Sequence, residues 1–179
     1  MTKSRIVVVC GNPKRGSRTL NVAIDIATEI ADGDAPSDVL DLIDLGADLL
    51  SWGTASVTSA VETVRTADVA VIGSPTYKAS YTGLLKVFLD HFDAGSLHRV
   101  VAVPVMLGGG WRHALAPEVH LRPVLVELGA VVPTSALYLL DGEVDGPTRQ
   151  TWLDQNRDVI RSAVDALRDE RRPTTHGRT

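Results

Sequence analysis

Short apolar runs recur along the chain, separated by segments in which apolar residues return every three or four positions. Four runs have the length of a buried strand, and most of them are nearly continuous in Val, Ile and other apolar residues: Arg5–Cys10, Asp68–Ser74, Arg99–Met106 and Val131–Leu140. Such strands are typical of a parallel sheet that is covered on both faces. A weaker run, Asp38–Ile43, alternates polar and apolar residues and predicts an edge strand.

The intervening segments have the spacing of amphipathic helices. We expect helices over about Ser17–Ala31, Val57–Ala67, Thr82–Phe92, Leu121–Leu128 and Trp152–Arg172. The order is thus β-α repeated five times, and right-handed crossovers would place helices on both sides of the sheet. This order predicts an α/β, flavodoxin-like three-layer sandwich with a five-stranded parallel sheet in the order 2-1-3-4-5. Residues 1–172 would form one domain, and Pro173–Thr179 a loose polar tail.

Ligands of this fold bind beyond the carboxyl ends of the strands, and the loops after strands 1, 3 and 4 have unusual compositions. The first, Gly11–Thr19, begins with a Gly-Asn-Pro turn that contains Asn12. Ser17 and Thr19 can cap the next helix, whose free N–H groups attract anions, and Arg18 adds a permanent positive charge. We predict a phosphate site here, although the loop taken alone would also suit a capped surface turn. Its spacing is neither GxGxxG nor GxxxxGK[ST], so neither a Rossmann dinucleotide site nor a P-loop is indicated.

The other two loops suit a planar ligand. The loop Gly73–Gly83 contains Tyr77 and Tyr81 and few core-type residues, so its backbone could meet the polar edges of a heterocycle. For Tyr81 we favour packing at the rim of the core. The loop after the fourth strand begins with Gly108, Gly109 and Gly110, which would let the backbone approach a flat ligand closely, or would simply make the loop flexible.

Composition narrows the classes of function. A hydrophobic fraction of 44 % excludes a disordered chain, and a formal net charge of −4 argues against nucleic acid as a partner. No apolar run is long enough to span a bilayer, so no membrane association is expected. The single cysteine, Cys10, allows no internal disulfide and suggests a cytoplasmic protein in which Cys10 is a small buried hydrophobe. The histidines share no metal-ligand spacing such as HExxH, so no metal site is expected.

These motifs together resemble the NAD(P)H-dependent FMN reductase family. The resemblance rests on Gly11-Asn12-Pro13, on Ser17-Arg18-Thr19, on Ser74–Lys86 and on Gly108–Leu125, and it covers roughly residues 5–140. The chain is most similar to the reductases that supply reduced flavin to alkanesulfonate and methanesulfonate monooxygenases. Members that use flavin as a substrate often carry an inserted aromatic residue or histidine in the helix after the glycine loop. His120 lies in that region, where it could fill this role or simply occupy the helix surface.

The resemblance implies a role for each loop. Ser17, Arg18 and Thr19 would hold the FMN phosphate, with Asn12 in the same loop. The isoalloxazine edge would be lined by Pro75, Thr76, Tyr77 and Lys78. The ring would pass near Gly108, Gly109 and Gly110, which would leave room for the nicotinamide of NAD(P)H.

Flavin itself carries the redox chemistry, so no catalytic side chain is named, and Lys78 is the best candidate for an electrostatic role. Two alternative functions remain. An FMN-bound quinone, azo-dye or chromate reductase would share these loops, and a non-enzymatic flavodoxin-type electron carrier would share the fold. The low aromatic content of 4 % and the modest net charge fit the electron carrier poorly. The apolar residues of Thr82–Phe92 exceed what one sheet face needs, so we expect part of this helix to be buried at a homodimer interface. The resemblance also implies a homodimer or a homotetramer, with a flavin-dependent monooxygenase as a further partner.

Overall fold

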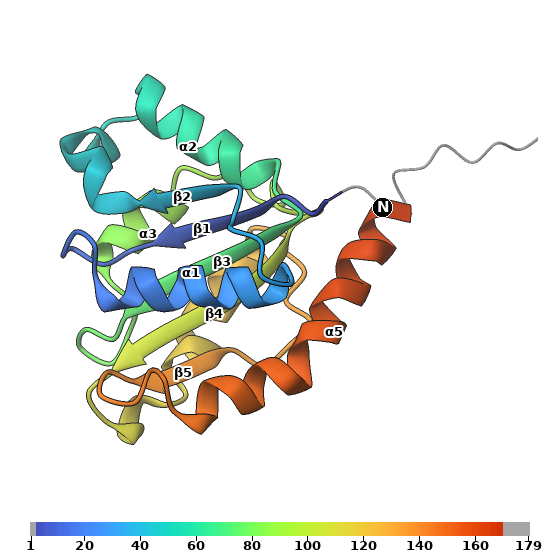
Figure 1. Ribbon diagram of the computed structural model, residues 1–179. Helices are drawn as coiled ribbons and strands as arrows, with labels where there is room; N and C mark the ends of the chain where they lie inside the picture. Colours follow the sequence, from blue (N-terminus) through green and yellow to red (C-terminus); the bar gives the residue numbers. More distant parts are fainter. Residues whose placement is uncertain (1–2, 170–179) are drawn as a thin grey trace, which may run out of the picture.

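Five parallel strands form the centre of the molecule (Figure 1). The computed structural model describes residues 3–169. Its strands are β1 (Ile6–Cys10), β2 (Asp38–Asp41), β3 (Val69–Pro75), β4 (Val101–Gly108) and β5 (Leu137–Leu140). They are ordered β2-β1-β3-β4-β5, and each neighbouring pair is parallel. The predicted flavodoxin-like order is therefore confirmed.

Helices cover both faces of the sheet. The α-helices are α1 (Arg18–Ile30), α2 (Ala55–Arg65), α3 (Gly83–Leu89), α4 (Arg122–Glu127) and α5 (Pro147–Asp169). Alternate residues of each strand point to opposite faces and feed two separate cores. Val8 of β1 packs in the core under α1 and α5, whereas Val7 and Val9 pack in the core under α2, α3 and α4. Both cores are closed by helices, which explains why the inner strands are continuously apolar.

Several element boundaries differ from those expected from sequence. The run Val131–Leu140 contributes only Leu137–Leu140 to the sheet, and Val131 forms a single bridge with Val101. Pro133 follows Val132 and has no N–H to donate, which explains why the ladder stops there. Ile43 belongs not to β2 but to a 3₁₀ segment, η1 (Leu42–Leu50). The predicted end of the last helix at Arg172, and the tail Pro173–Thr179, lie outside the described residues.

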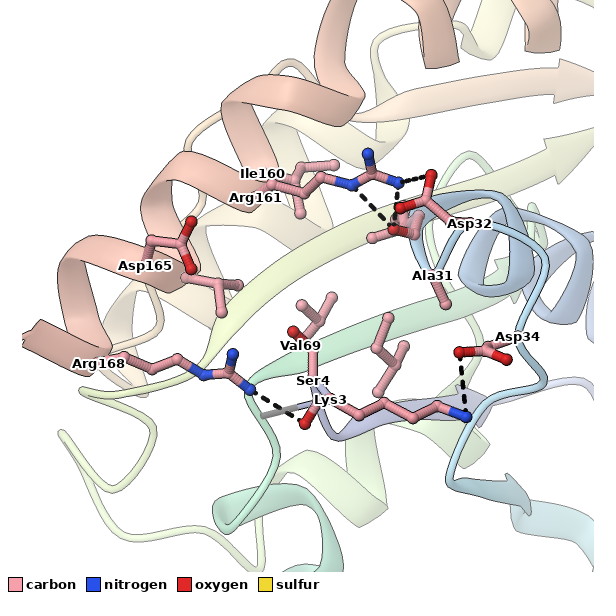
Figure 2. Close-up of a pocket in the computed structure, with 13 residues that line it drawn as sticks. Lys3, Ser4, Ala31, Asp32, Asp34, Val69, Ile160, Arg161, Asp165 and Arg168 are labelled. Atoms are coloured by element: carbon pink, nitrogen blue, oxygen red, sulfur yellow. Dashed lines mark hydrogen bonds and ion pairs between the residues drawn. The ribbon is translucent and has the colours of Figure 1, made fainter. Parts of the chain in front are cut away.

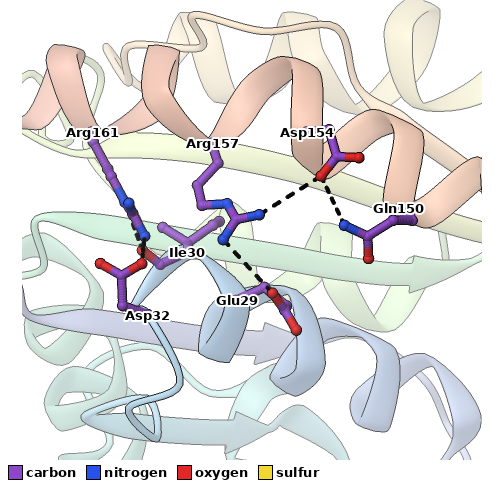
Figure 3. A network of polar contacts seen from close by, with 7 residues as sticks. All are labelled: Glu29, Ile30, Asp32, Gln150, Asp154, Arg157 and Arg161. Carbon is purple, nitrogen blue, oxygen red and sulfur yellow. Dashed lines mark hydrogen bonds and ion pairs between the residues drawn. The ribbon is translucent and has the colours of Figure 1, made fainter.

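Polar contacts fix α1 against α5 on one face of the sheet (Figure 3). The Arg161 guanidinium donates from Nη2 and Nε to the Ile30 carbonyl oxygen, at 2.9 and 3.1 Å, and Nη2 also pairs with Asp32 at 2.5 Å. Arg157 lies between Glu29 of α1, at 3.9 Å, and Asp154 of its own helix, at 3.8 Å. The free carbonyl end of α1 is thereby capped by cations, as the helix dipole favours. Because a helix is rigid, these contacts at the C-terminal end of α1 also help to position its N-terminal end, which adjoins the first loop.

Candidate functional site

The three loops singled out from sequence lie side by side at the carboxyl edge of the sheet. The Gly11 N–H donates to the Gly73 carbonyl at 2.8 Å, and the Thr76 N–H donates to the Leu107 carbonyl at 2.6 Å. These two hydrogen bonds join the end of β1 to the end of β3, and the end of β3 to the end of β4, where each strand passes into its loop. A Cβ on Gly11 would lie 2.5 Å from the Leu85 Cβ, so only glycine lets the first loop pass over α3. These contacts bring the predicted site residues from β1, β3 and β4 to one edge.

The first loop presents unpaired backbone donors at the start of α1. Ser17 is the N-cap, and its Oγ accepts the Leu20 N–H at 3.2 Å. Among residues 3–169, no acceptor takes the N–H groups of Arg18 and Thr19. Unpaired N–H groups at the positive end of a helix form an anion site. The geometry of the first loop therefore fits a phosphate group.

Asn12 organises the first loop from within. Its Oδ1 accepts the Lys14 N–H at 2.9 Å, and its Nδ2 donates to the Thr19 Oγ1 at 3.1 Å. Both Asn12 and Thr19 are buried. The two side chains therefore hold the loop in shape, and Thr19 presents its backbone N–H to the anion site rather than an exposed hydroxyl.

Arg18 projects from the first turn of α1 with most of its side chain exposed. Its Nη1 donates to the Asp141 carbonyl at 2.6 Å and lies 4.0 Å from the Asp141 Oδ1. The Asp141 N–H in turn donates to the Gly108 carbonyl at 3.0 Å. Arg18 thus bridges the first loop to the segment after β5 and, through Asp141, to the glycine loop. Its cation stays at the mouth of the site.

The loop after β3 is a tight, conformationally costly turn. Tyr77 and Ser80 exchange two backbone hydrogen bonds, at 2.8 and 3.1 Å. Between them Lys78 and Ala79 have φ angles of 51° and 66°, which is the type I′ geometry that usually requires glycine or asparagine. Two adjacent side-chain-bearing residues in the left-handed region are a strain that other contacts must offset. The turn presents Tyr77 and Lys78 to solvent.

Thr76, next to that turn, has a buried hydroxyl with no hydrogen-bond partner among the described residues. An orphaned polar atom of this kind is uncommon and costs free energy, and an absent ligand is one explanation. The hydroxyl groups of Ser74 and Thr82 already have hydrogen-bond partners within the protein. Ser74 Oγ accepts the Thr82 N–H at 3.1 Å, and the Thr82 hydroxyl caps α3. Pro75 is the buried last residue of β3. Thr76, Tyr77 and Lys78 therefore form the part of this loop that can meet a ligand.

The three glycines at the end of β4 and directly after it serve different purposes. A Cβ on Gly108 would lie 2.2 Å from the Tyr138 hydroxyl oxygen, so Gly108 is required by packing inside the protein. That hydroxyl donates to the Gly110 carbonyl at 2.8 Å and so holds the loop in place. Nothing lies within 4 Å of a Cβ on Gly109 or Gly110. Only these last two leave open space beside the backbone, and the role of Tyr138 was missed from sequence.

A π-helical turn, η3 (Pro117–Leu121), follows the glycine loop directly before α4. It contains His120, whose side chain is exposed. π-turns are rare, and they are frequently found at functional sites. The segment between the glycine loop and α4 is thus locally irregular. Val119 within η3 and Leu115 just before it are apolar side chains that are 56 % and 69 % exposed.

Two titratable side chains near the site are packing residues. Cys10 is fully buried at the end of β1, with its Sγ 3.6 Å from the Ser17 Oγ, and burial raises the pKa of its thiol. Tyr81 is half-buried against the core under α3, and burial likewise raises the pKa of its phenol. Both groups stay protonated near neutral pH. The interpretation of both residues as packing groups is confirmed.

A separate cavity of about 400 Å³ lies at the opposite edge of the sheet, between the end of α1 and α5 (Figure 2). Its floor is made of core side chains, and Lys3, Arg161 and Arg168 stand around it, each paired with an aspartate. This cavity does not adjoin the three loops. Within residues 3–169, no group of three or more His, Cys, Asp or Glu could hold a metal ion, and no helix is long and apolar enough to cross a membrane.

Comparison with known proteins agrees with this geometry. The family model of NADPH-dependent FMN reductases matches residues 4–145. The chain is 30 % identical over 150 residues to an FMN reductase (NADPH) of Pseudomonas aeruginosa, with 79 % of each chain covered. It is 31 % identical over 149 residues to the NADH-dependent FMN reductase SfnF of Pseudomonas fluorescens, with 78 % of each covered. The solved apo structure of an NADH:FMN oxidoreductase, EmoB, is 29 % identical, has a TM-score of 0.73, and covers 98 % of this chain and 97 % of its own.

The family model spans most of the chain, and the similarity to the two reductases extends over most of their lengths as well. The strand order and the three loops at one sheet edge are consistent with that relationship. The chain belongs to the NADPH-dependent FMN reductase family and is an oxidoreductase with a flavodoxin-like fold.

Proposed function

We propose that the three loops bind FMN and that the chain reduces it with NAD(P)H. The observation that carries this proposal is the placement of two unsatisfied groups at one sheet edge. The unpaired N–H groups at the start of α1 suit a phosphate, and the orphaned Thr76 hydroxyl lies beside the glycine loop, 3.1 Å from where a Gly108 Cβ would be. A flavin nucleotide carries both a phosphate and a ring with polar edges, so it would satisfy both groups.

The residues present fit such a ligand. Ser17, Arg18 and Thr19 would hold the phosphate, within a loop that Asn12 keeps in shape. Thr76, Tyr77 and Lys78 would meet the ring edge, and the open backbone of Gly109 and Gly110 would leave room for nicotinamide. When bound, FMN supplies the redox chemistry by accepting a hydride. The protein's contribution is to hold the two rings in contact, and the exposed Lys78 cation would stabilise the negative charge of reduced flavin.

We further propose that FMN leaves after reduction and serves a separate flavin-dependent monooxygenase. Two features support a site that releases its flavin. The exposed aromatic residues of the three loops are Tyr77 and Trp111, and the Trp111 ring already packs against that of Tyr138, with centroids 6.0 Å apart and the planes tilted by 50°. A flavin held between two aromatic faces would need more of them. The π-turn η3, which contains His120, lies between the glycine loop and α4, where the resemblance implies an inserted residue in members that use flavin as a substrate.

The experiment strips the purified protein by gel filtration and measures NADPH and NADH oxidation with catalytic and with excess FMN. We expect less than one FMN per chain after stripping, and turnover that rises with added FMN to saturation. Flavin retained at one per chain, with turnover raised only by a quinone or an azo dye, would instead establish the bound-cofactor reductase. Bound flavin without any oxidation of either nicotinamide would establish an electron carrier.

We also propose that the protein is a homodimer or a homotetramer. Leu85, Phe88, Leu89 and Phe92 are buried within one chain, whereas Leu84 and Val87 of α3 are only partly buried and remain available to a second copy. Exposed apolar side chains elsewhere among the described residues include Leu50, Trp52, Leu115 and Val119. A monomeric mass by light scattering at micromolar concentration would contradict this proposal.

A further inference from the structure

Asp41, the last residue of β2, reaches into the loop that precedes α1. In the sheet register its Cα lies opposite that of Cys10, from which the loop departs. Its Oδ2 accepts the Gly16 N–H at 3.1 Å. Gly16 has a φ of +57°, a conformation that favours glycine, so this bond secures an intrinsically mobile residue directly before the N-cap Ser17. Asp41 therefore helps to shape the anion site without belonging to it.

A second contact joins the same two segments. Arg15 forms an ion pair with Asp44, which lies one helical turn beyond Asp41 in η1. Residues 15 and 16 of the loop are thus held by residues 44 and 41, respectively. The charged and titratable groups that face Asp41 are Arg15 and Asp44 on these segments and the Cys10 thiol on β1.

The two oxygens of Asp41 are in unlike surroundings. While Oδ2 has its donor, Oδ1 is buried and has no hydrogen-bond partner among the described residues. A buried carboxylate oxygen without a donor is costly when charged and much less so when protonated. Burial raises the pKa of Asp41, and the Asp44 charge acts in the same direction, whereas the Gly16 N–H, the Arg15 cation and the Ile43 N–H oppose the rise without cancelling it.

We propose that Asp41 is a proton-linked positioning residue for the FMN phosphate: it holds Gly16 through Oδ2 and takes up a solvent proton on Oδ1 when the phosphate binds. The inference rests on the proposed FMN site. A phosphate dianion at the start of α1 brings negative charge close to the Asp41 carboxylate, and protonation removes the repulsion. No covalent bond to the phosphate forms, since the carboxylate and one proton simply become the carboxyl group.

The sign of the effect follows from linkage. Below the pKa of Asp41 the side chain is neutral and does not oppose the phosphate. As the pH rises through that pKa, the carboxylate appears and weakens FMN binding. The second ionisation of the phosphate, near pH 6, acts in the opposite direction, so only the comparison with a variant isolates Asp41.

The test measures FMN dissociation constants by flavin fluorescence from pH 5 to pH 8 for the wild type and three variants. Asp41→Asn keeps an oxygen acceptor for Gly16 and removes the charge, whereas Asp41→Ala removes both. Asp44→Asn is the matched control, because it deletes a neighbouring carboxylate and leaves Asp41 in place. Riboflavin, which has no phosphate, is the control ligand.

We expect Asp41→Asn to bind FMN like the wild type at pH 5 and about fivefold more tightly at pH 8. Asp44→Asn should keep a pH-dependent affinity, with the change moved to lower pH because the Asp44 charge no longer raises the pKa of Asp41. Asp41→Ala should bind more weakly at every pH. For riboflavin, the ratio of Asp41→Asn to wild type should not change with pH. A ratio for FMN that is constant with pH, or weaker binding by Asp41→Asn at pH 8, overturns the proposal.

A second measurement uses only the wild type, so it tests the proposal even if the Asp41 variants fail to fold. Calorimetry of the wild type at pH 7 in two buffers of different ionisation enthalpy counts the protons exchanged on binding. The count is compared with the protons that the second ionisation of free FMN releases at this pH. Proton uptake beyond that balance with FMN, and none with riboflavin, supports the role of Asp41, and an exchange equal to the phosphate's own refutes it. If the wild type binds neither flavin, the proposed function fails, whereas FMN binding with a constant ratio refutes only the role of Asp41.

Discussion

Replacing Gly108 by alanine tests the conclusion that this glycine is required by packing against Tyr138. The added Cβ would meet the Tyr138 hydroxyl oxygen at 2.2 Å and the Cζ of the same ring at 3.0 Å. Tyr138 is 5 % exposed, so its ring cannot simply swing into solvent. Overpacking of this kind costs about 1–3 kcal/mol, and the displaced hydroxyl would also lose its bond to Gly110, worth about 1 kcal/mol. We therefore expect a loss of about 2–4 kcal/mol.

Thermal and denaturant unfolding would measure this loss for Gly108→Ala, Tyr138→Phe and the double variant. In a domain of this size, each kcal/mol lowers Tm by roughly 2–4 °C. Tyr138→Phe alone should cost about 1 kcal/mol and, by removing the nearest atom, should relieve most of the clash in the double variant. Gly109→Ala is the matched control. A Cβ on Gly109 would meet nothing within 4 Å, so the free energy of unfolding of this variant should change by less than about 0.5 kcal/mol. Its KM for NAD(P)H should rise, because the added methyl group fills space proposed for the nicotinamide ring.

Two results would show this reasoning to be mistaken. One is a Gly108→Ala protein as stable as the wild type, which would mean that the loop after β4 shifts freely. The other is strict additivity of Gly108→Ala and Tyr138→Phe, which would mean that the two groups do not collide.

Three further variants or reactions test other parts of the structure. Arg18→Ala should weaken FMN binding by about 1.5–3 kcal/mol in a fluorescence titration, whereas Arg15→Ala, whose cation is paired with Asp44, should weaken it much less. Cys10 should resist iodoacetamide at pH 8 until the protein unfolds, because burial raises the pKa of its thiol, and rapid labelling of the folded protein would contradict its burial. Asp68→Ala should lower the unfolding free energy by about 2–4 kcal/mol in a denaturant titration, because buried Asp68 accepts from the Arg5 N–H at 2.9 Å and from Arg168 at 2.7 Å; an unchanged midpoint would show that these bonds contribute little.

The strand order was predictable because buried parallel strands have a distinctive composition. Val7, Val8 and Val9 are all fully buried, and no alternation is needed when both faces are covered. The last strand was placed too early, since Val131 and Val132 are apolar yet precede a proline. Arg122 fills the gap by donating to the carbonyls of Val132, at 2.8 Å, and Thr134, at 2.5 Å. No local pattern reveals such a long-range side-chain contact.

The candidate site was predictable at the level of its loops but not of every residue within them. Ser17 and Arg18 could be found because a cap and a cation beside a turn have a recognisable spacing. The contact of Gly108 with Tyr138 could not be predicted, because Tyr138 lies 30 residues further along the chain. Asp41 looked like an ordinary polar position of an edge strand. Its contact with Gly16 depends on the pairing of β2 with β1, which only the fold provides.

The layout of the sheet has a practical consequence for engineering. All three loops leave the carboxyl edge, while Lys3 and the end of α5 meet at the other, where Arg168 Nη2 donates to the Lys3 carbonyl at 3.3 Å (Figure 1). A purification tag, a fused enzyme or an electrode linker attached at either end of the described part of the chain would therefore start from the edge opposite the loops. Tethering by one end would orient the molecules on a surface with their loops toward the solution, whereas tethering through a lysine such as Lys78 would cover them.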